Sequence, residues 1–475
     1  MSSGMSFADE SVWPVVVFLA LILGSLLIGN TFKRYIPFLR KSLIPVSVIG
    51  GIVLLIISCV VKAISGDYLF NVLFSGEGNT MSGIEMLEVL TYHCLAVGFI
   101  AMTLRKSKKQ EKGNGRFAEV MNTGLTTVSA YLIQAFFGLV VTIVGSFFIP
   151  KLLKASGIIL CFGFGQGTGQ ALNYGSIYEN DYGFVGGKSF GLTIAALGFL
   201  AASIGGVIYL NYHKKKGDIV IRQLASELNN EVVEDEGEVP MVDSMDKLTL
   251  QLALVAVCYF LTYAIMYALA LVVPDGLVTT IYGFNFLIGA LSAVILKEIL
   301  KFLHKTKLMK RDYVNNFLLN RIAGFAFDIM IVAGIGAIRV DLIKDYWLIL
   351  LILGIVGVIV TFIYVKFVSF KLFKGYPHEE FMVMYGMLTG TASTGIILLR
   401  EIDPQFETPA SENIVYQNFP AILLGFPMML VAAFCPKSEA STYITLGIVL
   451  VYFLILNIIL FRSVIFRKKK KENPN

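Results

Sequence analysis

The amino-acid sequence predicts an all-α polytopic membrane protein with two inverted five-helix repeats, each with a re-entrant hairpin, and an extra C-terminal transmembrane helix. Of its 475 residues, 56% are hydrophobic and only 15% are charged. The hydrophobic residues gather in runs of about 20, the length of helix that crosses a bilayer core about 30 Å thick. Lysine and arginine gather in alternate loops, as in multi-pass proteins. This composition excludes an ordinary soluble domain.

Eleven apolar segments are long enough to cross the membrane as helices. They are 13–30, 45–64, 86–104, 121–148, 184–210, 249–273, 276–299, 314–338, 346–370, 412–434 and 441–464. Two other stretches, 155–178 and 380–402, are half apolar and rich in Gly, Thr and Ser. Because glycine weakens a continuous helix, we expect these two stretches to enter the membrane and turn back.

The basic residues orient the predicted helices. If the acidic N-terminus is outside, the inner loops include "RKSKKQEKGNGR" (105–116) and "HKKKGD" (213–218), whereas the outer loop "VPDG" (273–276) has no Lys or Arg. Eleven spans then place the basic tail "FRKKKK" (466–471) in the cytoplasm, beside the lipid headgroups. The N-terminus lacks the pattern of a cleaved signal peptide, so we expect the first helix to remain in a multi-pass plasma-membrane protein.

A hydrophilic segment, 212–247, divides the chain into two halves. It is acid-rich and has the composition of a flexible cytoplasmic linker. We expect an N-terminal repeat at 13–211, a C-terminal repeat at 248–434, and the extra helix with its basic tail at 441–475.

The two halves share local sequence matches in the same order. The most useful pair aligns "GFGQGTGQA" (163–171) with "GMLTGTAST" (386–394). Each half has five spans, an odd number, so the halves must be inverted relative to each other. Internal repeats of this kind often locate the binding site of a transporter.

The glycine-rich stretches predict a site because lipid offers no hydrogen bonds. Irregular backbone at membrane depth survives only against protein or a water-filled cavity. Two such stretches that meet can bind an anionic group with helix N-termini, and a small cation such as Na⁺ with unwound carbonyls. Close helix packing is the alternative for each stretch alone. A dinucleotide fingerprint would need a preceding strand and is excluded here.

The candidate site residues follow from these stretches and from intramembrane polar residues. For the substrate we predict Gly167, Thr168, Gly169, Gly390, Thr391, Ser393, Thr394 and Arg321. For the cation we predict Gly165, Gln166, Thr389, Asp328 and Asn418, with the Na⁺ ligands unassigned among these.

Two charged residues of the eighth span carry part of this hypothesis. Arg321 could bind a substrate carboxylate, and Asp328 could bind a cation or a proton. The alternative is a structural pair, or an Arg321 side chain that extends to the inner surface. For His93, Lys188 and Asn285 we expect structural roles: helix contacts or interface anchoring.

The chain resembles the bacterial sodium/glutamate symporter family. The resemblance rests on "IPVSVIGGIV" (44–53), on "GQGTG" (165–169) followed by "YGF" (182–184), and on "GMLTGTASTG" (386–395). It implies a homodimer in the bacterial inner membrane, with a mobile core that carries glutamate with Na⁺ in an elevator-like motion against a scaffold. Two positions depart from the family: Gln166 stands where a His is usual, and Ser393 where a Pro is usual.

We therefore expect a secondary active transporter of glutamate or a similar small carboxylate, with Na⁺ as coupling ion and the lipid bilayer as surroundings. A symporter of another organic anion, or one coupled to H⁺, is the alternative. A channel or membrane-embedded enzyme is remote, because the four histidines form no metal-type cluster. We expect no catalytic activity, no cofactor and no nucleic-acid partner, and the five single cysteines predict no disulfide.

Overall fold

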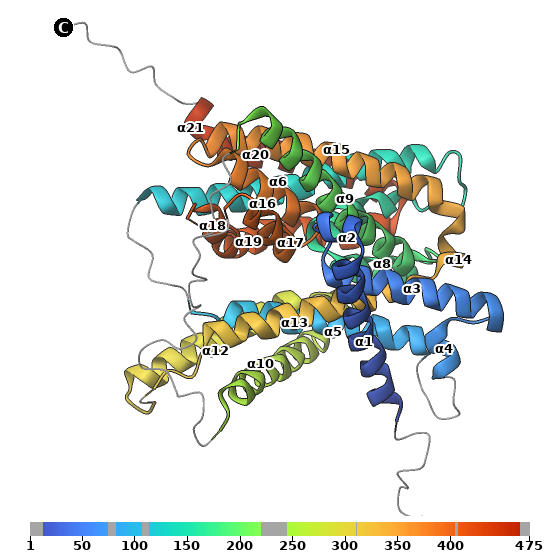
Figure 1. The fold of residues 1–475 in the computed structure, drawn as a ribbon, viewed down its shortest axis with the longest axis horizontal. Coiled ribbons are helices and arrows are strands. Elements are labelled where there is room, and N and C mark those ends of the chain that lie inside the picture. Colours follow the sequence, from blue (N-terminus) through green and yellow to red (C-terminus); the bar gives the residue numbers. More distant parts are fainter. Residues whose placement is uncertain are drawn as a thin grey trace, which may run out of the picture. The chain divides into compact units, whose positions relative to one another are not determined.

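The computed structural model describes residues 13–74, 82–106, 114–219, 245–309, 311–403 and 407–465. These residues are helical with connecting loops, and no strand occurs among them (Figure 1). Most of the predicted linker, the inner loop at 107–113 and the basic tail from 466 onward lie outside the described residues.

Ten helical segments among the described residues are long and apolar enough to cross a membrane. They are Pro14–Tyr35, Val46–Ser65, Gly83–Leu104, Phe117–Gly145, Gly187–Lys216, Lys247–Ala270, Asn316–Gly336, Val340–Leu372, Pro420–Lys437 and Glu439–Leu460. Each overlaps one of the eleven predicted spans. The chain thus has the character of a multi-pass helical membrane protein.

The predicted span 276–299 does not form one helix. The chain forms α11 (Asp275–Gly283) and α12 (Asn285–Lys305), with a break at Phe284. Neither helix is among the ten, since α11 is short and α12 carries charges at Lys297, Glu298 and Lys301.

The chain divides into two compact units. Unit 1 contains the described parts of Met1–Gln110, Thr168–Ala196 and Ala225–Lys344, and unit 2 those of Glu111–Gly167, Leu197–Leu224 and Asp345–Asn475. Each unit takes helices from both predicted halves of the chain, so the units do not coincide with the predicted repeats. One boundary falls between Gly167 and Thr168.

Unit 1 is assembled around α5 and α13. Its helices are α1 (Pro14–Tyr35), α2 (Pro37–Lys41), α3 (Val46–Ser65), α4 (Leu69–Leu73), α5 (Gly83–Leu104), α8 (Thr168–Tyr182), the start of α9 (Gly187–Lys216), α10 (Lys247–Ala270), α11, α12, α13 (Asn316–Gly336) and α14 (Val340–Ile343). Helices α12 and α13 both pack along α5 (Figure 1). Small residues permit such packing: a methyl group on Gly98 of α5 would lie 2.5 Å from the Phe327 ring of α13.

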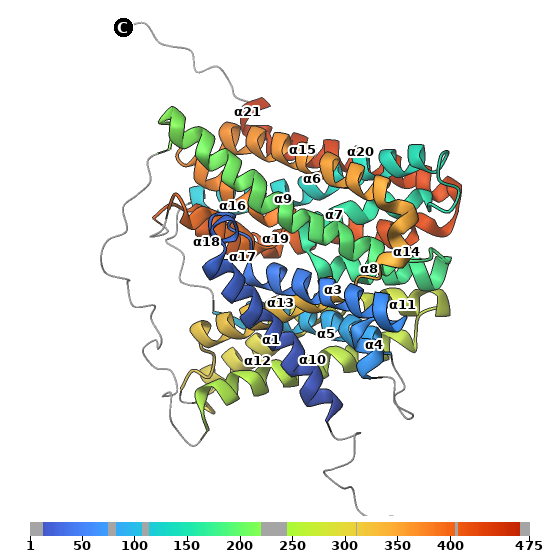
Figure 2. The same cartoon turned by 45° about the vertical axis from the view of Figure 1, so that its right-hand side comes forward.

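Unit 2 is assembled around α6. Its elements are α6 (Asn114–Gly145), η2 (Lys154–Ile158), α7 (Ile159–Gln166), the rest of α9, α15 (Trp347–Leu372), α16 (Pro377–Thr389), α17 (Ala392–Arg400), α18 (Ala410–Tyr416), α19 (Asn418–Phe434), η4 (Cys435–Lys437), α20 (Glu439–Leu460) and α21 (Arg462–Ile465). Helices α15 and α20 pack along α6 (Figures 1 and 2). Backbones touch where η2 meets α6, because a methyl group on Gly157 would lie 1.9 Å from the Gly138 carbonyl oxygen.

Candidate functional site

The first glycine-rich stretch breaks at a single residue. Gly167 separates α7 from α8 and has φ +81° and ψ −169°. This conformation is essentially restricted to glycine, because a Cβ atom would clash with the backbone. The alternating glycines therefore leave the two flanking helices intact and interrupt the chain only here.

The second glycine-rich stretch breaks at Gly390 and Thr391. Helix α16 ends before them, and α17 begins with Thr391 as its N-cap, whose hydroxyl accepts a hydrogen bond from the Thr394 backbone N–H. Helices α16 and α17 pack against each other: a methyl group on Gly386 would lie 2.7 Å from Gly395 Cα. Thr389 is buried and donates to the Tyr385 carbonyl at 2.6 Å.

The two breaks meet within unit 2. A methyl group on Gly167 would lie 3.3 Å from Thr391 Cγ2 and 3.7 Å from the Gly390 carbonyl oxygen. The Phe199 ring of α9 borders both breaks, at 3.8 Å from the same position on Gly167 and 3.2 Å from that on Gly390. The C-terminal ends of α7 and α16 therefore lie close together.

Helix α6 supplies hydrogen-bond donors to the ends of both broken helices. The Tyr131 hydroxyl donates to the Gly165 carbonyl at 3.2 Å, and the Gln134 amide donates to the Leu388 carbonyl at 2.9 Å. Gly165 and Leu388 are the second-last residues of α7 and α16, whose carbonyls have no partner within their own helices. One helix thus caps two helix ends.

Gln134 also presents an unpaired oxygen at this place. Its Nε2 must face Leu388, since a carbonyl can only accept. Its Oε1 has no hydrogen-bond partner, although the residue is fully buried, and this oxygen lies 3.4 Å from the Cβ position of Gly165. Sequence reasoning missed Gln134, because a lone glutamine in an apolar helix gives no distinguishing pattern.

On the other side of the first break, α8 is embedded in unit 1. Thr168 is fully buried and donates to the Met330 carbonyl of α13 at 3.3 Å. Gly169 faces Met330 as well, since its Cβ position is 2.9 Å from the Met330 sulfur. Gln170, a second residue that sequence reasoning missed, is buried with both side-chain amide atoms unpaired.

The remaining predicted site residues lie in different surroundings. Gln166 ends α7 with its Nε2 buried and unpaired. Ser393 is exposed in the first turn of α17. In α19, Asn418 accepts a hydrogen bond from the neighbouring Gln417 amide at 3.2 Å.

The two charged residues of the eighth span both lie at the surface of α13. The Arg321 guanidinium sits 5.0 Å from the centre of the Phe317 ring. It is nine residues before Met330, which corresponds to about 14 Å along a helix. Asp328 lies near the Ser47 hydroxyl of α3. The structure therefore separates Arg321 from the Thr168 contact on the same helix.

Lys188 pairs with Glu88 inside unit 1, whereas we expected it to anchor the chain at the interface. Its ammonium lies 2.7 Å from the Glu88 carboxylate, which is only 8% exposed. Arg339 lies 3.3 Å from the same carboxylate and 3.5 Å from that of Glu179. The two carboxylates and the two cations thus neutralise one another, as charges that are largely removed from water require.

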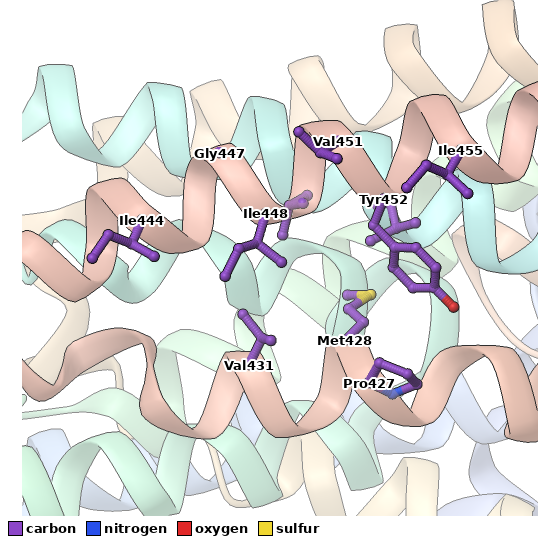
Figure 3. Close-up of a pocket in the computed structure, with 11 residues that line it drawn as sticks. Pro427, Met428, Val431, Ile444, Gly447, Ile448, Val451, Tyr452 and Ile455 are labelled. Atoms are coloured by element: carbon purple, nitrogen blue, oxygen red, sulfur yellow. The ribbon is translucent and has the colours of Figure 1, made fainter.

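A pocket of about 500 Å³ in unit 2 lies elsewhere, between α19 and α20 (Figure 3). Only apolar atoms face it, among them those of Met428, Val431 and Ile448. Burial of a charge requires a paired or hydrogen-bonding partner, so this pocket suits acyl chains rather than a carboxylate.

Comparison with known protein families gives no match for this chain, and comparison with curated proteins gives none either. The described residues contain no group of three or more His, Cys, Asp or Glu side chains that could hold a metal ion. The geometry of the two breaks is therefore the feature of this chain that bears on its function.

Proposed function

We propose that the chain is a secondary active transporter that carries a small carboxylate, such as glutamate, together with Na⁺ by alternating access. One observation carries the proposal: the two helix breaks meet beside a buried, unpaired amide oxygen of Gln134. Broken helices at membrane depth are a common design of substrate and ion sites in secondary transporters.

The cation fits the ends of α7 and α16. The C-terminus of a helix carries partial negative charge on its unpaired carbonyls, and here two such ends converge. Gln134 Oε1 adds a neutral oxygen that has no donor to satisfy it. A Na⁺ ion would satisfy this oxygen without a carboxylate, and its charge would be offset by both helix ends.

The anion fits the start of α17. Its first backbone N–H groups lie at the second break, where the Thr391 and Thr394 hydroxyls lie 3.3 Å apart, and Ser393 belongs to the same turn. A substrate carboxylate can accept hydrogen bonds from such groups. Cation and carboxylate would then lie near each other, so each would raise the affinity for the other.

The architecture that we propose has inverted repeats and re-entrant breaks in a multi-pass inner-membrane protein with an outer N-terminus. The matching positions of the capped carbonyls, second from the end in both α7 and α16, support a repeat relation. A homodimer with an elevator-like motion remains part of the proposal from the family resemblance.

Uptake by purified protein in liposomes tests the proposal. We expect accumulation of radiolabelled glutamate, aspartate, malate or citrate to require an inward Na⁺ gradient and to stop in equimolar K⁺. Gln134→Leu should lose the Na⁺ dependence. Gln251→Leu is the matched control, because this buried glutamine uses its Nε2 and Oε1 for protein hydrogen bonds. Accumulation of all substrates without any ion gradient would contradict active transport.

Coupling to H⁺ is the second candidate, and Asp328 favours it. This carboxylate lies near the middle of α13, a helix apolar enough to cross the membrane. A carboxylate at that depth can bind and release a proton. Uptake driven by a pH gradient in Na⁺-free buffer, and lost in Asp328→Asn, would replace Na⁺ by H⁺ as the coupling ion.

A further inference from the structure

Unit 1 contains a third helix break, at Phe284 between α11 and α12. The break lies within the apolar stretch 276–299, where irregular backbone needs protein partners. Two side chains supply them. The Tyr92 hydroxyl of α5 donates to the Tyr282 carbonyl at 2.6 Å, and the Asn173 amide of α8 donates to the Gly283 carbonyl.

Asn285, directly after the break, has an unpaired oxygen. Its Nδ2 donates to the Tyr92 carbonyl at 3.1 Å, and this acceptor fixes the orientation of the amide. Its Oδ1 has no hydrogen-bond partner, although Asn285 is fully buried. A buried acceptor without a partner destabilises the folded protein. A cation or a hydrogen-bond donor bound at Asn285 Oδ1 would remove this penalty.

Two tyrosine hydroxyls lie beside the Asn285 side-chain amide. The Asn285 amide interacts with those of Tyr92 and Tyr259, the latter near the middle of α10. The Tyr259 hydroxyl is 2.6 Å from His93 Nδ1. If it donates to that nitrogen, its oxygen keeps lone pairs for another ligand. Oxygen atoms from α5, α10 and α12 thus gather at the C-terminal end of α11.

The arrangement repeats that of Gln134. In both places side chains cap the last carbonyls of a broken helix, and a buried amide donates its N–H to a carbonyl while its oxygen stays unpaired. The unpaired amide oxygen of Asn285 can coordinate a cation but cannot bind an anion, because it has no proton to donate. The neutral oxygens favour a monovalent cation over a divalent one, which prefers carboxylates.

We infer that the α11–α12 break is a second monovalent-cation site, with Asn285 Oδ1 as a ligand and the hydroxyls of Tyr92 and Tyr259 beside the same side-chain amide. The site is independent of the two breaks in unit 2. The choice of Na⁺ as its ion rests on the proposed function.

Thermal unfolding of the purified full chain in Na⁺, at constant ionic strength with K⁺ as replacement, tests the inference. We expect Asn285→Leu to weaken the apparent Na⁺ affinity about tenfold or more, the size expected for loss of one ligand. Asn285→Asp should bind Na⁺ more tightly than wild type, because a carboxylate adds charge. Asn457→Leu is the matched control, since this asparagine of α20 donates to Phe453 and accepts from Tyr364.

The Gln134→Leu background separates the two sites. Na⁺ should still stabilise Gln134→Leu and should no longer stabilise Gln134→Leu/Asn285→Leu. If Gln134→Leu alone abolishes the response, and neither Asn285→Leu nor Asn285→Asp changes the wild-type response, the second site is overturned while the proposed function stands. A wild-type protein that responds equally to Na⁺ and K⁺ would overturn both. If Asn285→Leu does not fold, the apparent Na⁺ affinities of Asn285→Asp and Tyr259→Phe test the second site in its place.

Discussion

Both glycine-rich stretches interrupt a helix, but different contacts stabilise the two breaks. At the second break, both helices belong to unit 2 and pack against each other, and Thr391 caps the start of α17. At the first break, α7 belongs to unit 2 and α8 to unit 1, and Gly167 alone departs from helical backbone angles. The second break is thus supported by several contacts, whereas the first depends on one residue without a side chain.

Replacing the glycine at each break should therefore have unequal effects. Gly167→Ala forces a Cβ into a conformation that costs about 1–3 kcal/mol. The same change at Gly390, whose φ is −142°, brings the Cβ to 3.0 Å from the Thr394 hydroxyl, 3.1 Å from the Gly386 carbonyl oxygen and 3.2 Å from the Phe199 ring, contacts that shifts of a few tenths of an ångström relieve. We expect Gly167→Ala to reduce Na⁺-driven uptake at least about tenfold, the effect of such a strain on an equilibrium, and Gly390→Ala to reduce it less.

The same two variants, measured by thermal unfolding in detergent, should rank in the same order. Gly24→Ala in α1 serves as control, because nothing lies within 4 Å of its Cβ position. Equal losses at Gly167 and Gly390 would show that the breaks are supported alike.

The two α6 side chains that cap α7 and α16, Tyr131 and Gln134, should also contribute unequally to stability. Gln134→Leu leaves the Leu388 carbonyl without its donor in a fully buried place, which costs about 1–3 kcal/mol. Tyr131→Phe removes a longer bond to Gly165, so we expect a smaller decrease in the unfolding free energy. Urea or thermal unfolding of both variants measures the difference, and a larger loss in Tyr131→Phe would reverse the assignment.

The N-cap of α17 has no counterpart at the first break. Thr391→Val removes the oxygen that accepts from the Thr394 N–H, and loss of such a cap costs about 1 kcal/mol. Thr391→Ser keeps the cap and should keep stability. Thr168→Val removes a donor to Met330 rather than a cap, so we expect weaker substrate or Na⁺ affinity with folding intact. Identical unfolding curves for Thr391→Val and wild type would contradict the capping role.

The second break follows a helix, α16, whose first turn contains a histidine, His378. Burial, and then the neighbouring His213 ring at 4.9 Å, lower the pKa of His378 in α16 below its ordinary value of 6.5. The Asp218 carboxylate raises this pKa, whereas the cations Lys366 and Lys216 lower it. Since the folded state then binds this proton less readily than the unfolded state, stability should fall as the pH drops below about 6.5.

Thermal unfolding between pH 7.5 and 5.5 measures this smallest effect. His378→Gln should reduce this loss of stability at low pH, because glutamine stays neutral and can still form a hydrogen bond with the Tyr209 hydroxyl, which lies 2.7 Å from His378 Nδ1. His304→Gln in the exposed end of α12 is the control and should leave the slope unchanged. If stability changes with pH equally in His378→Gln and His304→Gln, groups other than His378 cause the pH dependence.

The sequence predicts the apolar helices well, since length and hydrophobicity are local properties. Ten of the eleven predicted spans have a matching helix, and the exception, 276–299, breaks at "GFN" (283–285), where one glycine gave too weak a signal. The glycines also locate Gly167 and Gly390–Thr391 as breaks. Gln134 and Asn285 could not be found in this way, because their importance depends on the carbonyls that tertiary packing places beside their amides.

The division of the chain into two units also escapes sequence reasoning. A linker and a pair of similar halves predict a boundary near 212–247, yet each unit combines segments from both halves. Packing between helices far apart in the chain decides the units, as where α13 lies along α5. Local composition carries no information on such pairings.

The contact between Gly138 of α6 and Gly157 of η2 constrains how this sequence can change over time. A methyl group on either residue would lie about 2 Å from the carbonyl oxygen of the other, at 2.1 Å and 1.9 Å. A single codon change at one position cannot be relieved by a smaller residue at the other, since both already have the smallest side chain. Any lineage that keeps this fold must keep both glycines or shift the helix and η2 apart.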